Sequence, residues 1–166
     1  AHYILGRMRS AHDHFDNCIA LCRTHELGRI EIANLAMRGA TRLYAVGVDA
    51  AIEDVRAATD LAVKLGNRRA EAIARNIAGY VLSYAAQYEA AHAEAERGIA
   101  LARALGSHRF EAKSLLNLGL ALFGLTERAA AEQALDEAYA IGEQSRIELW
   151  TPWVLGAIAL VTCRPE

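Results

Sequence analysis

An aliphatic residue followed by glycine recurs four times along this chain, and the recurrence constrains its fold more than any other feature. The pairs begin at residues 27, 65, 105 and 141, which lie 38, 40 and 36 residues apart. Each pair follows an alanine-rich run, and alanine has the highest helix propensity of all residues. A period of this length is typical of helical hairpins that stack in an array. The pattern therefore predicts an all-α repeat protein.

The glycine pairs divide the chain into three full repeats between two partial ones. We place the partial repeats at 1–26 and 141–166, and the full repeats at 27–64, 65–104 and 105–140. Residues 8–23 align without gaps on residues 88–103, so the chain is expected to begin in mid-hairpin, as a fragment of a longer protein. We treat the whole of 1–166 as a single repeat domain.

Within the full repeats, the two helices are expected to separate near glycine or near a polar break. These points are Gly47, Ala86-Gln87 and Gly124. The last partial repeat should enter its helix at Thr151-Pro152, because threonine caps a helix N-terminus and proline needs no donated amide there.

Small and large apolar residues recur in each repeat at the spacing of the tetratricopeptide consensus. The third repeat has Leu115, Leu118, Gly119, Leu122, Ala131, Leu135 and Ala138; the second has Gly79, Leu82, Ala91 and Gly98; the first has Leu35, Gly39, Ala51, Val55 and Ala58. The chain resembles the tetratricopeptide family, although its repeats are longer than the usual unit of that family. The resemblance implies antiparallel helix hairpins stacked in a right-handed superhelix, an α-solenoid. Segments 105–112 and 152–160 also resemble the C-terminal repeats of bacterial nucleotide cyclase–ATPase fusion proteins.

Charge and cysteine content exclude several classes of partner. The net charge is −2, with 18 basic and 20 acidic residues, so no field attracts nucleic acid or anionic lipid. The longest apolar run, 153–163, is too short to span a bilayer. The odd set of Cys18, Cys22 and Cys163 has no framework spacing, which favours a reducing compartment and hence the cytoplasm.

One cluster of residues near the N-terminus has the composition of a metal site. Its members are His12, His14, Cys18, Cys22 and His25. Four of them share a helical stripe about 16 Å long, so at most two neighbours could reach one zinc ion. In the self-alignment Cys18 and Cys22 fall on small buried positions. We therefore predict core cysteines, solvated histidines, and neither metal nor cofactor.

No other residue set supports catalysis, and we expect the chain not to be an enzyme. A phosphate-binding glycine loop is absent, and no serine, histidine and aspartate can be grouped without assumed geometry. Glu89, Glu94 and Glu96 are expected to form a solvated acidic face. A basic strip of Arg68, Arg69, Arg75, Arg109 and Lys113 is interrupted by Glu71 and Glu111. The rival hypothesis of a helical enzyme would rely on His12, His14 or His92.

The resemblance also implies where a partner would bind, since the first helix of each tetratricopeptide hairpin lines a concave groove. The groove residues implied are Ile73, Asn76, Tyr80, Ser83 and Tyr84 in the second repeat, Lys113, Leu116, Leu120 and Phe123 in the third, and Ala33, Ala36, Ala40, Leu43 and Tyr44 in the first. Tyrosines with an asparagine have the composition of a recognition surface. The alternative is that the leucine and phenylalanine positions pack against the neighbouring helix.

These features favour a non-catalytic protein-interaction or regulatory module of a larger bacterial protein. It would bind a peptide or another domain of its own chain in the groove. The alternative is a sensor of a small molecule or signalling peptide within a transcriptional or cyclase-type regulator. Trp150 and Trp153 lie where the array lacks a polar cap, so we also expect self-association through the ends.

Overall fold

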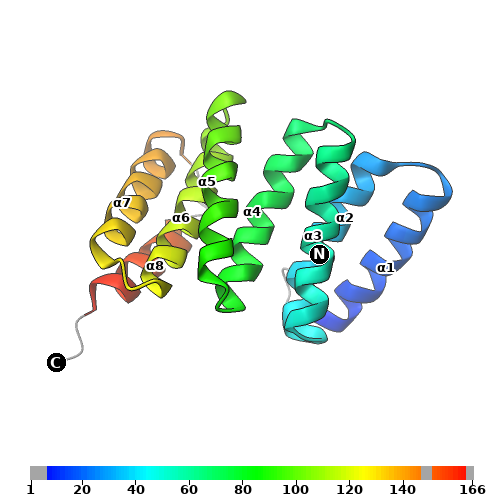
Figure 1. The fold of residues 1–166 in the computed structure, drawn as a ribbon, viewed down its shortest axis with the longest axis horizontal. Coiled ribbons are helices and arrows are strands. Elements are labelled where there is room, and N and C mark those ends of the chain that lie inside the picture. Colours follow the sequence, from blue (N-terminus) through cyan, green and yellow to red (C-terminus); the bar gives the residue numbers. More distant parts are fainter. Residues whose placement is uncertain (1–6, 147–150, 164–166) are drawn as a thin grey trace. The chain divides into compact units, whose positions relative to one another are not determined.

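Residues 7–146 and 151–163 are described by the computed structural model, and within them the chain forms eight α-helices and no β-strand. The helices are α1 (Met8–Thr24), α2 (Gly28–Ala45), α3 (Val48–Lys64), α4 (Arg68–Tyr84), α5 (Tyr88–Ala104), α6 (His108–Gly124), α7 (Arg128–Gln144) and α8 (Thr151–Thr162). The described turns between α1 and α7 are short, and within each unit neighbouring helices such as α1 and α2 or α6 and α7 run antiparallel and pack against each other (Figure 1). The all-α class and the hairpin repeats are confirmed, and the right-handed superhelix stays a prediction.

The helices recur with a stricter period than the glycine pairs. The odd-numbered helices begin at positions 8, 48, 88 and 128, and α2, α4 and α6 begin at positions 28, 68 and 108, so both series follow one 40-residue register. Helix α8 is described from Thr151 onward, and the residues directly before it, which bear on the expected threonine-proline start, lie outside the described ranges. Helix α7 continues through Ile141 and Gly142 to Gln144, so it ends beyond the sequence-derived boundary. A glycine inside a helix costs only about 1 kcal/mol, which packing can offset.

The turns share one way of ending a helix. A residue with φ between 51° and 66° follows the helix end at positions 26, 66, 86, 106, 126 and 146, in step with the helix register. Where the turn is fully described, the next amide donates back across the last turn, as from Asn67 to the carbonyl of Ala62 at 3.1 Å. This is the Schellman motif, which satisfies carbonyls that the helix leaves unpaired.

Two compact units make up the chain, residues 1–81 and 82–166, and each is described by itself. In the first, α1 to α4 bury one apolar cluster of Ile19, Ile32, Leu35, Ala36, Ala58, Ala62, Ala70 and Ala74. Helices α2 and α3 approach closely at Gly39. A Cβ on Gly39 would lie 2.7 Å from Cγ1 of Val55 and 3.0 Å from the carbonyl oxygen of Ala51.

The second unit repeats this packing with larger side chains. Its cluster consists of Ile99, Leu115, Leu116, Leu122, Ala131, Ala134, Leu135, Ala138, Val154, Ala157 and Val161. A Cβ on Gly119 of α6 would lie 2.6 Å from Cγ of Leu135 on α7. On another face of α6, the Ser114 hydroxyl lies close to Gly98 of α5. Helix α6 therefore holds a different neighbour on each of two faces. None of the helices in the described ranges is both long and apolar enough to cross a membrane.

Candidate interaction surface

The fourteen residues assigned to a binding groove all lie on even-numbered helices, and Ala33, Ala36, Ala40 and Leu43 are among those in α2. Tyr44 is in α2; Ile73, Asn76, Tyr80, Ser83 and Tyr84 are in α4; and Lys113, Leu116, Leu120 and Phe123 are in α6. These are the helices that begin each hairpin in the sequence-derived repeats. The set divides between the two units, with Ser83 and all later members in the second.

In the first unit, the structure brings together two tyrosines that are distant in the sequence. The hydroxyls of Tyr44 and Tyr80 are hydrogen-bonded, and the side chain of Tyr44 is 51% exposed. Tyr80 and its neighbours Ile73 and Asn76 are half-buried. The pair offers apolar ring surface together with hydroxyl groups that can donate or accept. It is the most coherent part of the assigned surface.

In the second unit, the residues assigned to the binding surface differ in how exposed they are. Tyr84 is 54% exposed and Ser83 is half-buried. Leu116 is only 5% exposed and belongs to the second core, against which Leu120 and Phe123 also pack. Leu116, Leu120 and Phe123 thus pack within the protein, as the alternative for the leucine and phenylalanine positions expected. They leave little surface for a partner.

Lys113 lies half-buried on α6, four residues after the exposed Arg109. Burial lowers the pKa of the Lys113 ammonium, and the neighbouring guanidinium of Arg109 lowers that pKa further. Both effects disfavour the charged form of the lysine.

A network of charged side chains joins α1, α2 and α3, and it was not foreseen from the sequence. Arg38 donates two hydrogen bonds to the carboxylate of Asp54, at 2.7 and 2.6 Å, and a third to Asp16 at 2.6 Å. Asp54 has a side chain only 4% exposed. The bonds that Arg38 donates, first those to Asp54 and then that to Asp16, raise the pKa of Arg38 above its usual value. Such a bidentate pair is strong and geometrically specific.

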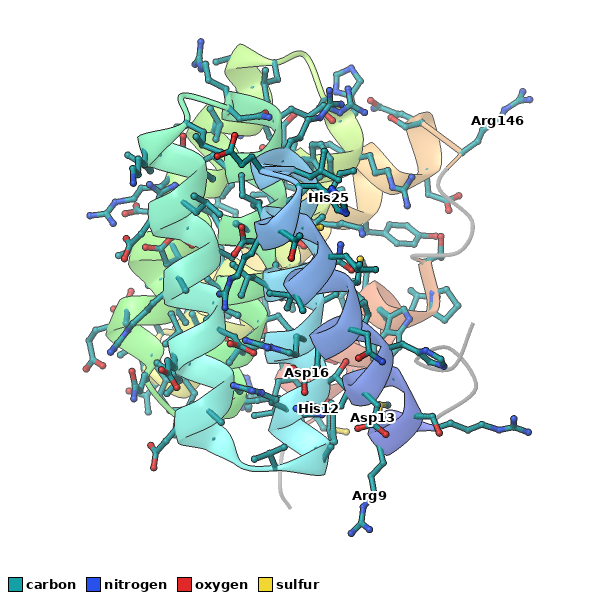
Figure 2. The ribbon with its side chains drawn as sticks, turned by 90° about the vertical axis from the view of Figure 1, so that its right-hand side faces the viewer. Arg9, His12, Asp13, Asp16, His25 and Arg146 are labelled. Atoms are coloured by element: carbon teal, nitrogen blue, oxygen red, sulfur yellow. The ribbon has the colours of Figure 1, made fainter. Side chains whose placement is uncertain are left out.

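His12 extends the network toward the surface. Arg42 donates from Nε to Nε2 of His12 at 3.2 Å and from Nη1 to Asp54 at 3.3 Å. Because arginine cannot accept, Nε2 of His12 is the acceptor and its other nitrogen, Nδ1, faces Asp16 at 3.4 Å. Figure 2 shows His12 and Asp16 one turn apart on α1, with Arg9 and Asp13 near the start of the helix. The expectation that His12 is solvated is wrong, since its side chain is 18% exposed.

The 40-residue register contains the signal that would have revealed this network. Arg38, Arg42 and Asp54 stand where the third repeat has Leu118, Leu122 and Ala134. The Arg38 and Arg42 positions are apolar in both other full repeats, whereas the Asp54 position is also charged in the second repeat, as Glu94. Charges at positions that are apolar elsewhere must be paired, because burying an unpaired charge is costly. The uneven spacing of the glycine pairs obscured this alignment.

The remaining residues of the histidine and cysteine cluster do not converge. Cys22 is buried and Cys18 half-buried, while His14 and His25 are exposed. Burial raises the pKa of the Cys22 thiol, and the adjacent Cys18 adds to the rise. In the described ranges, no three histidine, cysteine or carboxylate side chains lie close enough together to hold a metal ion.

Some members of the acidic and basic sets, and the two glutamates that interrupt the basic strip, form ion pairs within the protein. Glu71 pairs with Arg75 at 2.7 Å, and Glu111 pairs with Arg103 at 2.6 Å. Glu96 is 64% exposed, but the side chain of Glu94 is only 18% exposed. Glu94 therefore does not belong to a solvated face, in contrast to the expectation.

Comparisons with known proteins add no assignment. No model of a protein family matches the chain, and no curated protein matches it either.

Proposed function

We propose that this chain is a non-catalytic interaction or regulatory module that binds a peptide or another protein domain through the surface of helices α2 and α4 around Tyr44 and Tyr80. One observation carries the proposal: the exposed Tyr44 beside Tyr80 in the first unit. Tyrosine supplies large contact area with little conformational entropy to lose, and it is enriched among residues that dominate binding energy.

The charged groups nearby support a binding role over a reactive one. Arg38, Arg42 and Asp54 satisfy one another inside the hairpins. A partner would therefore meet mainly apolar and hydrogen-bonding groups on α2 and α4. The tetratricopeptide resemblance and the bacterial, cytoplasmic setting belong to the same proposal.

The test is the double variant Tyr44→Ala/Tyr80→Ala, used as bait in affinity capture from a bacterial lysate beside the wild-type chain. We expect a partner captured by the wild type to bind the variant at least about tenfold more weakly, a loss of about 1.4 kcal/mol. Leu21→Ala is the matched control, since Leu21 is an exposed apolar residue on α1. Circular dichroism should show unchanged helix content in both.

Equal capture by the wild type and the double variant would rule out this surface. The sensor alternative gives a different result: a metabolite or short peptide would raise the melting temperature of the chain with no protein partner present.

A further inference from the structure

Helix α1 carries two cysteines in contact with each other. Cys18 and Cys22 are four residues apart in α1, so both lie on one face of the helix. Cys22 is only 2% exposed, whereas Cys18 is half-buried. The two thiols are hydrogen-bonded to each other. The pair therefore has one sulfur shielded from solvent and one that solvent can reach.

The 40-residue register shows that packing does not require sulfur at these two positions. The other odd-numbered helices have small residues there: Ala58 and Ala62 in α3, Gly98 and Ala102 in α5, and Ala138 and Gly142 in α7. All six are buried. Alanine or glycine thus completes the hairpin in three helices, and only α1 places a pair of thiols at the equivalent positions.

The pair has too few neighbouring ligands for zinc. His14 and His25 continue the stripe at its two ends, but both are exposed, and no three histidine, cysteine or carboxylate side chains in the described ranges could hold one ion. The carboxylate of Glu31, whose charge acts on Cys22, is engaged by Arg23 at 2.7 Å. A structural zinc site needs four ligands in a tetrahedron. The sequence-based argument against a metal concerned zinc, and it holds for zinc.

The spacing of the two thiols suits an ion that takes two ligands in a line. Residues four apart on a helix have Cβ atoms about 5–6 Å apart. With metal–thiolate bonds of about 2.3 Å, a linear arrangement places the two sulfurs about 4.6 Å apart. Two thiols that already touch across one helical turn can reach this separation without a change in the backbone. Thiolate ligands are soft and select Cu(I) among the common cations.

We propose that Cys18 and Cys22 form a two-coordinate site for a soft monovalent cation, Cu(I), on α1. Binding forms two Cu–S bonds, breaks the two S–H bonds and releases both protons to solvent, with no change in the oxidation state of copper or sulfur. The ion reaches the site past the half-buried Cys18, and the buried Cys22 shields it from water.

Proton release makes the affinity of this site depend on pH. Burial raises the pKa of the Cys22 thiol, and the neighbouring Cys18 raises it further. Both thiols must lose a proton to bind copper, so the affinity should rise with pH.

The test is a titration of the fully reduced chain with Cu(I) under anaerobic conditions, in competition with the chelator bicinchoninate. We expect one copper ion per chain and two protons released per ion, measured with an indicator dye in weak buffer. X-ray absorption at the copper edge should show two sulfur neighbours and no nitrogen or oxygen.

The other repeats supply variants that keep the fold. Cys18→Ala and Cys22→Ala introduce the residues that α3 has at the equivalent positions, so both should retain the wild-type circular dichroism spectrum. Each should weaken Cu(I) binding at least about hundredfold. Cys163→Ser is the matched control and should leave binding unchanged, because Cys163 is exposed and follows α8.

Several results would overturn the proposal. Copper binding that survives Cys18→Ala or Cys22→Ala, or that is lost with Cys163→Ser, would place the ion elsewhere. A nitrogen or oxygen neighbour at copper, or a single proton released per ion, would show that the two thiols do not form the site together. Zn(II) that displaces stoichiometric Cu(I) would show that the site is not selective for a soft ion.

Discussion

Left-handed backbone occurs after six helices in the described ranges, and glycine occupies the position at only two of them, Gly66 and Gly106. Glu26, Ala86, Thr126 and Arg146 adopt φ values between 51° and 66° at the others. A side chain with a Cβ in this conformation costs about 1–2 kcal/mol, and glycine avoids that cost. The turns therefore retain local strain that the packing of the helices overcomes.

Thr126→Gly should stabilise the chain. Threonine is β-branched and its φ is 66°, so glycine removes backbone strain from the folded state. Glycine also increases the conformational entropy of the unfolded chain, which offsets part of this gain. We expect a net gain of about 0.5–1 kcal/mol in urea unfolding. Gly106→Ala is the control at an equivalent turn and should lose about 1 kcal/mol; a gain from that substitution would contradict the explanation.

Asp54 is the residue on which the buried charge network depends. Asp54→Ala removes the acceptor of two bonds from Arg38 and leaves a guanidinium whose side chain is 13% exposed. We expect a loss of about 3 kcal/mol in the free energy of unfolding, measured by urea titration at neutral pH. A change below about 1 kcal/mol would mean that solvent replaces the carboxylate.

The third repeat supplies the matched rescue for Asp54→Ala. The triple variant Arg38→Leu/Arg42→Leu/Asp54→Ala places its residues Leu118, Leu122 and Ala134 in the first hairpin. Apolar replacement of a complete buried ion network is often neutral or stabilising. We therefore expect the triple variant to be more stable than Asp54→Ala alone, and failure to exceed it would indicate that the hairpin needs the charges.

At the scale of the helix, glycines at two positions have opposite consequences. A Cβ on Gly119 would meet Leu135 and the Ala131 carbonyl, whereas no described residue lies within 4 Å of a Cβ on Gly142. Gly119→Ala should destabilise the chain by about 1–3 kcal/mol through overpacking. Gly142→Ala should stabilise it by about 0.5–1 kcal/mol, since alanine is the better helix former.

Thermal unfolding by circular dichroism compares these two variants directly. Opposite shifts in melting temperature are expected, each of roughly 2–4 °C per kcal/mol for a chain of this size. A rise with Gly119→Ala would show that α6 and α7 can separate without loss.

Helix existence and phase were predictable because they are local properties. The breaks near Gly47, Ala86-Gln87 and Gly124 agree with the helix bounds within a few residues. The exposure of Leu116, which was assigned to the binding surface, could not be predicted from local properties. Leu116 and Leu120 lie four residues apart on one helix face, yet Leu116 is buried and Leu120 is half-buried. Which apolar residue remains accessible depends on neighbouring helices, not on spacing.

For the molecule as a whole, the 40-residue register predicts which deletions preserve the fold. Removing residues 75–114 joins the first part of α4 to the last part of α6 in unchanged helical phase. Removing residues 75–112 instead adds two residues to the joined helix and rotates its second part by about 200°. The first deletion should retain cooperative urea unfolding and strong helical circular dichroism, since its apolar face stays continuous.

The shorter deletion, of residues 75–112, serves as the control. We expect it to unfold without cooperativity and to bind a hydrophobic dye. The apolar residues of the two parts of its joined helix would lie on opposite faces, so both could not be buried at once. If both deletions unfolded with the same cooperativity and bound the same amount of dye, helix packing would not depend on the 40-residue period.

The sequence alone determined the helical class, the hairpin repeat and the approximate helix ends. Propensity, turn residues and apolar periodicity act over a few residues, so a linear pattern records them. The tertiary structure alone decided that Arg38 pairs with Asp54 and that Tyr44 meets Tyr80. It also decided that Leu116 is covered while Leu155 is not. These outcomes depend on which side chains of separate helices come within contact distance, and helix packing sets that distance.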